Sequence, residues 1–137
     1  MIYNLSVTNN QIYIEGIPIL KFLKSFEDDL YYEIENGIKI YTITNIVFCN
    51  ISGILNIYIT NNKIIKLVFT VYNAINIYNV PNIPINFETT INLIKTNLKQ
   101  KYRQINDLNF FNKKFTFTIT HNEFNMSILI SNRILEV

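Results

Sequence analysis

The most reactive side chains in this sequence are its single cysteine, Cys49, and its single histidine, His121. A thiol and an imidazole within hydrogen-bonding distance can act as nucleophile and general base, as in thiol hydrolases. Cys49, however, lies in an apolar run with Phe48 and Ile51, which favours a buried thiol of raised pKa. His121 is expected at a solvated hairpin tip, where Glu123 alone does not complete a catalytic group. These positions therefore favour a protein that is not an enzyme.

Metal and cofactor chemistry is restricted further by the residue counts. One cysteine and one histidine cannot supply the four protein ligands of a structural zinc site. The carboxylates between positions 27 and 35 could hold a hard cation, but their spacing lacks the glycine-containing calcium-loop pattern. With only Gly16, Gly37 and Gly53, the chain has no glycine-rich phosphate loop of the Rossmann or P-loop type. We therefore expect no cofactor and no metal.

The acidic stretch EDDLYYEIE, residues 27–35, is typical of an interaction surface. Tyrosine is common at binding hot spots because it brings a large contact area at low entropic cost. Carboxylates around it would attract a basic partner and speed association. The alternative is an ordinary solvated acidic face. The residues assigned to partner binding are Glu27, Asp28, Asp29, Tyr31, Tyr32, Glu33 and Glu35.

A basic surface is expected in the C-terminal half. Lys95, Lys99, Lys101 and Arg103 gather toward the end of an expected helix, where the helix dipole favours cations, and Lys113-Lys114 follows. These side chains could contact phosphates, but aromatic stacking residues are not regularly interleaved with them. The formal net charge of +2 is also too small to argue for nucleic acid. Nucleic-acid binding is therefore the less favoured interpretation.

Composition places these candidates in one folded domain spanning residues 1–137. Hydrophobic residues make up 49% of the chain, enough to offset the entropy of ordering it, whereas charged residues make up only 16%. The abundance of isoleucine, asparagine and lysine indicates an AT-rich genome. One cysteine allows no internal disulfide, and neither a signal peptide nor a membrane-spanning run is evident. We expect a cytoplasmic protein.

The elements that must position these residues are organised around Ile54–Tyr72. Two runs of β-branched and aromatic residues flank the polar turn Asn61-Asn62-Lys63, which tolerates positive φ. In the second run one face carries four apolar residues, Ile65, Leu67, Phe69 and Val71. A hairpin this apolar must bury one face fully, and we therefore expect it at the centre of a sheet.

Strand and helix signals precede this hairpin. The expected turns are Thr8-Asn9-Asn10, Asn36-Gly37 and Ser52-Gly53, and Pro18 suits a first helical position. The expected elements are strands at Ile2–Val7 and Gln11–Glu15, a short helix at Pro18–Phe26, a strand or irregular segment at Leu30–Ile34, and strands at Ile38–Ile43 and Ile46–Asn50.

A long amphipathic helix is expected after the hairpin, from Glu88 to Gln104. Its apolar stripe steps by three or four residues through Phe87, Ile91, Ile94, Leu98, Tyr102 and Ile105. Before it, Ala74–Val80 fits a strand, and Pro81 and Pro84 exclude a central one. After it, Ile105–Lys114 is expected to be a loop. A closing hairpin then points Phe115, Phe117, Ile119, Phe124, Met126, Ile128 and Ile130 to one face.

This order predicts an α+β fold: a single, mostly antiparallel sheet of about six to eight strands. One long amphipathic helix packs on one face, and the other face is either covered by the short N-terminal helix or partly exposed. An exposed edge such as Phe124–Ser131 could pair across a two-fold axis, so a homodimer is one possible state.

In outline, the chain resembles the small immunity proteins encoded beside bacterial polymorphic toxins. The resemblance rests on the layout of the N-terminal hairpin QIYIEG, the brief helix, the meander containing YTITNIVFCNISGILNIYI, one amphipathic helix and a closing hairpin. It carries over no site residue. It implies a non-enzymatic inhibitor that binds a cognate toxin and occludes its active site or anchors beside it. The alternative is a phage or viral accessory or structural protein, such as a host-enzyme inhibitor.

Overall fold

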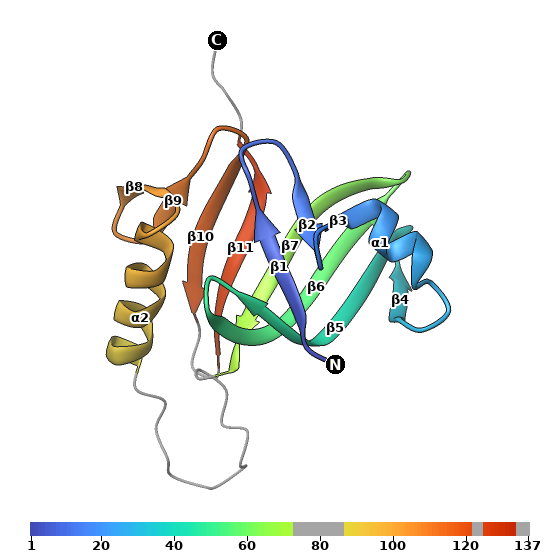
Figure 1. The fold of residues 1–137 in the computed structure, drawn as a ribbon, viewed down its shortest axis with the longest axis horizontal. Helices are drawn as coiled ribbons and strands as arrows, with labels where there is room; N and C mark the ends of the chain where they lie inside the picture. Colours follow the sequence, from blue (N-terminus) through green and yellow to red (C-terminus); the bar gives the residue numbers. More distant parts are fainter. Residues whose placement is uncertain (73–86, 122–124, 134–137) are drawn as a thin grey trace, which may run out of the picture.

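The computed structural model describes residues 1–72, 87–121 and 125–133. The described elements, in chain order, are β1 Tyr3–Val7, β2 Ile12–Ile14, β3 Ile17–Pro18, α1 Ile19–Ser25, β4 Tyr31–Glu35, β5 Ile38–Phe48, β6 Ile51–Thr60, β7 Lys63–Val71, α2 Phe87–Lys99, β8 Arg103–Asn106, β9 Asn109–Phe111, β10 Phe115–His121 and β11 Met126–Asn132. The strands form one eleven-stranded sheet, more than the six to eight expected. The two helices lie toward opposite ends of it (Figure 1).

The strand order explains how the sheet is built. It runs β3-β2-β1-β5-β6-β7-β11-β10-β9-β8, and β4 pairs with β5 beside this path. The predicted central hairpin is confirmed as β6 and β7, which lie in the middle of the sheet between β5 and β11. Its inward face is fully buried as alternation requires, through Leu55, Ile57, Leu67, Phe69 and Val71.

Ile65 is the exception on that face. The register between β6 and β7 shifts after the pair Tyr58 and Lys66, so that Ile59 then faces Ile64 and Ile65 has no partner opposite it. A bulge of this kind breaks the two-residue alternation. Ile65 is therefore 40% exposed, and its predicted place with Leu67 on the buried face is wrong.

The turn between β5 and β6 also differs from the prediction. Cys49 and Asn50 turn the chain with φ of 51° and 61°, the positive pair typical of a tight hairpin. Ser52 and Gly53, expected as the turn, lie inside β6. Gly53 serves close packing there: a Cβ atom would overlap the Thr70 carbonyl oxygen and lie 2.7 Å from the Phe69 ring.

The sheet is mixed: among the described strands one pair is parallel, and the other pairs are antiparallel as expected. β1 runs parallel to β5, with Tyr3 to Leu5 opposite Ile46 to Phe48. A register irregularity between Ile43 and Ile46 divides β5 into two halves. The first half pairs with β4 and the second with β1 along the same edge.

α2 is shorter than the predicted helix from Glu88 to Gln104. α2 ends at Lys99, and the backbone N–H groups of Lys101 and Tyr102 donate to the Leu98 carbonyl at 3.1 and 2.8 Å. This turn brings Tyr102 into the core, and its ring stacks on Phe117 with centroids 4.0 Å apart. The chain beyond it, expected as a loop, forms the antiparallel strands β8 and β9, and Ile105 in β8 is exposed.

The prediction that Phe124–Ser131 forms an exposed edge for self-association is also wrong. β11 lies between β7 and β10, so the described part of Phe124–Ser131 has partners on both sides and offers no free edge. Phe124 lies outside the described residues. So does the segment from Ala74 to Pro84, where a strand was expected at Ala74–Val80 and the two prolines excluded a central one.

The sheet curls so that parts far apart in strand order meet (Figure 1). The tip of the β1–β2 hairpin contacts the loop between β9 and β10 through three hydrogen bonds. Asn112 Nδ2 donates to Thr8 O at 2.9 Å, Lys113 N to Asn9 Oδ1 at 3.1 Å, and Lys114 Nζ to Asn10 O at 3.2 Å. We call this contact the seam.

The core fills the concave side of the curled sheet. Phe48 from β5 lies against Phe69, Tyr102 and Phe117, with ring centroids 5.8 to 6.3 Å apart. From α2, Ile94 and Leu98 are fully buried, as the predicted stripe required. Among the described residues, no helix is long and apolar enough to cross a membrane.

Candidate functional site

The acidic stretch of residues 27–35 forms an exposed edge in the structure. It consists of the turn after α1 and the strand β4, and we call it the acidic edge. All five residues of β4 are exposed, and among the described residues β4 pairs only with β5. Tyr31 and Ile34 are 63% and 69% exposed, unusual values for large apolar side chains. An exposed strand edge with apolar side chains is a ready template for another chain.

Alternation divides β4 into two faces. On one face, Tyr31 and Glu33 are neighbours, and the Tyr31 hydroxyl donates to Glu33 Oε1 at 2.5 Å. This hydrogen bond, and then the charge of the Glu33 carboxylate, raises the pKa of Tyr31 above its ordinary value. Both groups are exposed, so the pair presents a phenol and a carboxylate together to a partner.

The other face of β4 is organised around Lys39 of β5. The Lys39 amine lies 4.0 Å from the Tyr32 ring centroid and 4.9 Å from that of Tyr41. It also pairs with Glu27 at 3.6 Å. Lys39 therefore orients Tyr32 and neutralises one carboxylate of the acidic edge. Four further carboxylates remain on this surface: Asp28, Asp29, Glu33 and Glu35.

Cys49 has the environment expected of an unreactive thiol. It is buried in the β5–β6 turn, where its carbonyl accepts a hydrogen bond from Asn97 Nδ2 of α2 at 2.9 Å. Burial raises the pKa of Cys49 to about 11, although Lys101 and a hydrogen bond with Tyr102 act in the opposite direction. Such a thiol is protonated at neutral pH and is a poor nucleophile.

His121 is exposed at the end of β10, opposite Met126 of β11, next to the tip where it was expected. Residues 122–124 of that tip, including Glu123, lie outside the described part of the chain. Within the described ranges, no three His, Cys, Asp or Glu side chains come together in a way that could hold a metal ion.

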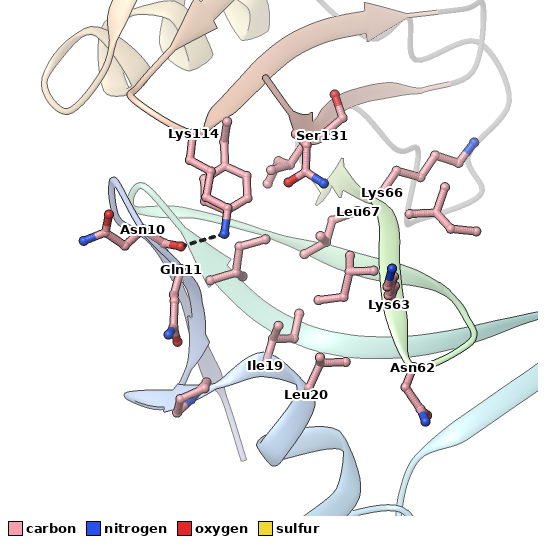
Figure 2. Close-up of a pocket in the computed structure, with 17 residues that line it drawn as sticks. Asn10, Gln11, Ile19, Leu20, Asn62, Lys63, Lys66, Leu67, Lys114 and Ser131 are labelled. Carbon is pink, nitrogen blue, oxygen red and sulfur yellow. Dashed lines mark hydrogen bonds between the residues drawn. The ribbon is translucent and has the colours of Figure 1, made fainter. Parts of the chain in front are cut away.

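A groove of about 550 Å³ opens where β7 and β11 diverge. Their pairing stops at Leu67 and Ile130, while both strands continue. Figure 2 shows Ile19 and Leu20 of α1 on one side, Leu67 and Ser131 on the other, and the Lys114 amine bonded to Asn10. Its apolar floor and amine-bearing rim suit an apolar group next to an anion. The sequence pattern did not reveal it, because its walls come from both halves of the chain.

The fold divides the basic residues singled out in the sequence, and brings three of them to one hollow. Lys95 pairs with Asp107 at 2.5 Å, and Lys114 is bonded at the seam. Lys101, Arg103 and Lys113 instead line a second, smaller hollow. Arg133 also lines this hollow. The sequence did not indicate Arg133, because no other basic residue lies near it in the chain.

No protein-family model matches this chain, and neither a curated protein nor a solved structure proved similar to it. The class that its described residues define is a β-rich α+β protein with an exposed acidic strand at the edge of its sheet.

Proposed function

We propose that this protein is a non-enzymatic inhibitor that binds another protein through the acidic edge, and that its partner is a cognate bacterial toxin. The observation that carries the proposal is the state of β4, an exposed strand paired on one side within the described residues. Proteins normally shorten or cover such edges. Retaining one with exposed Tyr31 and Ile34 is consistent with a surface that a partner covers.

The backbone of β4 supports recognition by strand addition. A strand docking against it would satisfy the free N–H and C=O groups and provide affinity that depends little on sequence. The side chains of Tyr31, Tyr32 and Ile34 would then supply specificity, because aromatic anchors contribute much of the binding energy at interfaces.

The charge of the acidic edge supports a basic partner. Five carboxylates lie between residues 27 and 35, and the cation within reach of them in the described structure is Lys39, which pairs with Glu27. A toxin that acts on nucleic acid must carry a basic surface to approach phosphates. An acidic inhibitor would meet that surface with fast, salt-dependent association.

Support for a non-enzymatic role comes from the reactive side chains. The thiol of Cys49 is buried with a raised pKa, so it is protonated and a poor nucleophile at neutral pH. An enzyme that used either residue would lose its activity in Cys49→Ser or His121→Ala without losing its fold.

The partner is identified by gene order and by capture from the native host. A toxin gene directly beside this one, and recovery of its product on the immobilised chain, would support immunity. Neighbouring virion genes with a captured host enzyme would instead make the protein a phage or viral accessory inhibitor.

Association kinetics with the purified toxin test the acidic edge itself. We expect reversal of Asp28, Asp29 and Glu33 to lysine to lower the association rate about tenfold or more at low salt, with a smaller change in dissociation. Glu33→Lys alone should act in the same direction, whereas Glu88→Lys at the start of α2, distant from β4 (Figure 1), is the charge-matched control. Equal association rates for wild type and the triple variant would remove the acidic edge from the proposal.

A further inference from the structure

A second charged site lies beside the seam, away from the acidic edge. It is a hollow of about 380 Å³ between the turn after α2, the β9–β10 loop and the end of β11, and we call it the basic pocket. Four cationic side chains line it: Lys101, Arg103, Lys113 and Arg133. Among the residues that the structure describes, its lining contains no aspartate or glutamate.

Hydrogen bonds of the seam fix the walls of this pocket. Asn9 Oδ1 accepts from the Lys113 backbone, and Asn112 Nδ2 donates to Thr8 O, which locks the loop to the β1–β2 tip. On the opposite wall, the buried Tyr102 hydroxyl donates to Val7 O at 3.0 Å. The pocket is therefore formed before any ligand binds.

The guanidinium group of Arg133 is held in a defined position. It lies 4.3 Å from the centroid of the Phe111 ring, and Nη1 donates to the Asn112 carbonyl at 3.2 Å. An arginine oriented in this way loses little side-chain entropy when it binds, and its planar fork matches the oxygens of a phosphate.

The electrostatics of the pocket favour an anion of high charge. The ion pairs formed among the described residues use Lys39 and Lys95, and neither lines this pocket. Four like charges around a small hollow repel one another, and a multivalent anion relieves that repulsion. A volume near 380 Å³ lies at the lower end of small-ligand sites.

The aromatic residues of the pocket argue against a nucleic-acid strand. Base stacking on aromatic rings is a main source of affinity for single strands. Here Tyr102 is 8% exposed, and one face of Phe111 is occupied by Arg133. The cations remain the accessible groups, and they recognise phosphate oxygens.

We propose that the basic pocket binds a compact polyphosphate group, either free or at the end of a nucleotide. This site is independent of the acidic edge, since β8 and β9 lie toward one end of the molecule and β4 toward the other (Figure 1). Lys101 and Arg103, both exposed, supply charge, and Arg133 supplies the oriented fork.

Isothermal titration of the full chain with pyrophosphate, and separately with ADP, tests this inference. We expect wild type to bind pyrophosphate with a dissociation constant of about 1 mM or lower at low salt, and binding to weaken as salt is added. The double variant Lys101→Gln/Arg103→Gln should bind about tenfold more weakly. The control Lys21→Gln/Lys24→Gln removes the same charge from α1 and should keep wild-type affinity.

A third variant separates the geometry of the site from its charge. Arg133→Lys preserves the charge but loses the two-pronged contact, so it should also weaken pyrophosphate binding several-fold. ADP binding as tightly as pyrophosphate supports a free polyphosphate ligand, and tighter ADP binding supports a nucleotide. No binding of either probe at about 10 mM, or equal weakening in the α1 control, would overturn the inference.

Discussion

At the scale of single residues, the burial of Cys49 couples folding to pH. The pKa of its thiol is raised from 9.0 to about 11, because burial disfavours the thiolate. Between these two values the native thiol keeps its proton while the unfolded thiol has lost it. The stabilisation is therefore complete below pH 9 and is lost as the pH rises through the native pKa.

Cys49→Ser removes this ionisation and adds no bulk. Between about pH 8.5 and 10.5, we expect the free energy of unfolding of wild type to fall by about 2 kcal/mol more than that of the variant. Urea denaturation at constant ionic strength measures the difference. Burial, and then the neighbouring Cys49, also raises the pKa of Tyr102, so the difference between the two proteins includes a smaller contribution from Tyr102. Identical pH profiles would contradict a buried, protonated thiol.

At the scale of elements, the sequence predicted what local periodicity encodes. Alternation located the central hairpin and the closing hairpin and the buried faces of their described residues, apart from the bulged Ile65. The predicted stripe gave the burial of Ile94, Leu98 and Tyr102 correctly. The predicted helix was too long, because the chain leaves the helix before Tyr102 and a turn at Leu98 brings Tyr102 to the core. The parallel pairing of β1 with β5 joins distant segments, and no local pattern reports such a contact.

Gly53 provides a test of how closely β6 and β7 pack. In Gly53→Ala the new methyl group meets the Thr70 carbonyl and the Phe69 ring, so the strands must move apart. We expect a loss of stability of about 1–3 kcal/mol by chemical denaturation. Ser52→Ala is the control: Ser52 is the exposed neighbour of Gly53 on β6, so its replacement should change stability by less than about 0.5 kcal/mol. Similar losses in both variants would show that strand packing at Gly53 is not the cause.

At the scale of the whole molecule, the small net charge of +2 includes two separate charged surfaces, the acidic edge and the basic pocket. The acidic edge is continuous in sequence, so its residues could be identified from composition alone, and the structure keeps them together. The basic pocket is assembled by the curl of the sheet from residues as distant as Asn9 and Arg133. The sequence placed three of its four cations, Lys101, Arg103 and Lys113, on one basic surface with Lys95, Lys99 and Lys114, but gave no sign that Arg133 belongs with them.

The seam that closes the curl depends on Asn112. Its side chain donates to Thr8 O, and its Oδ1 accepts from the backbone N–H groups of Lys114 and Phe115 at 3.1 and 2.8 Å. Asn112→Ala removes these exposed and part-buried hydrogen bonds, at a cost of about 0.5–1.5 kcal/mol. Asn4→Ala is the control, because Asn4 is exposed on β1 and takes no part in the hydrogen bonds of the seam. We expect hydrogen exchange at the β1–β2 tip to accelerate in Asn112→Ala alone, together with weaker pyrophosphate binding. Unchanged exchange at that tip would show that the core, not the seam, holds the sheet in its curl.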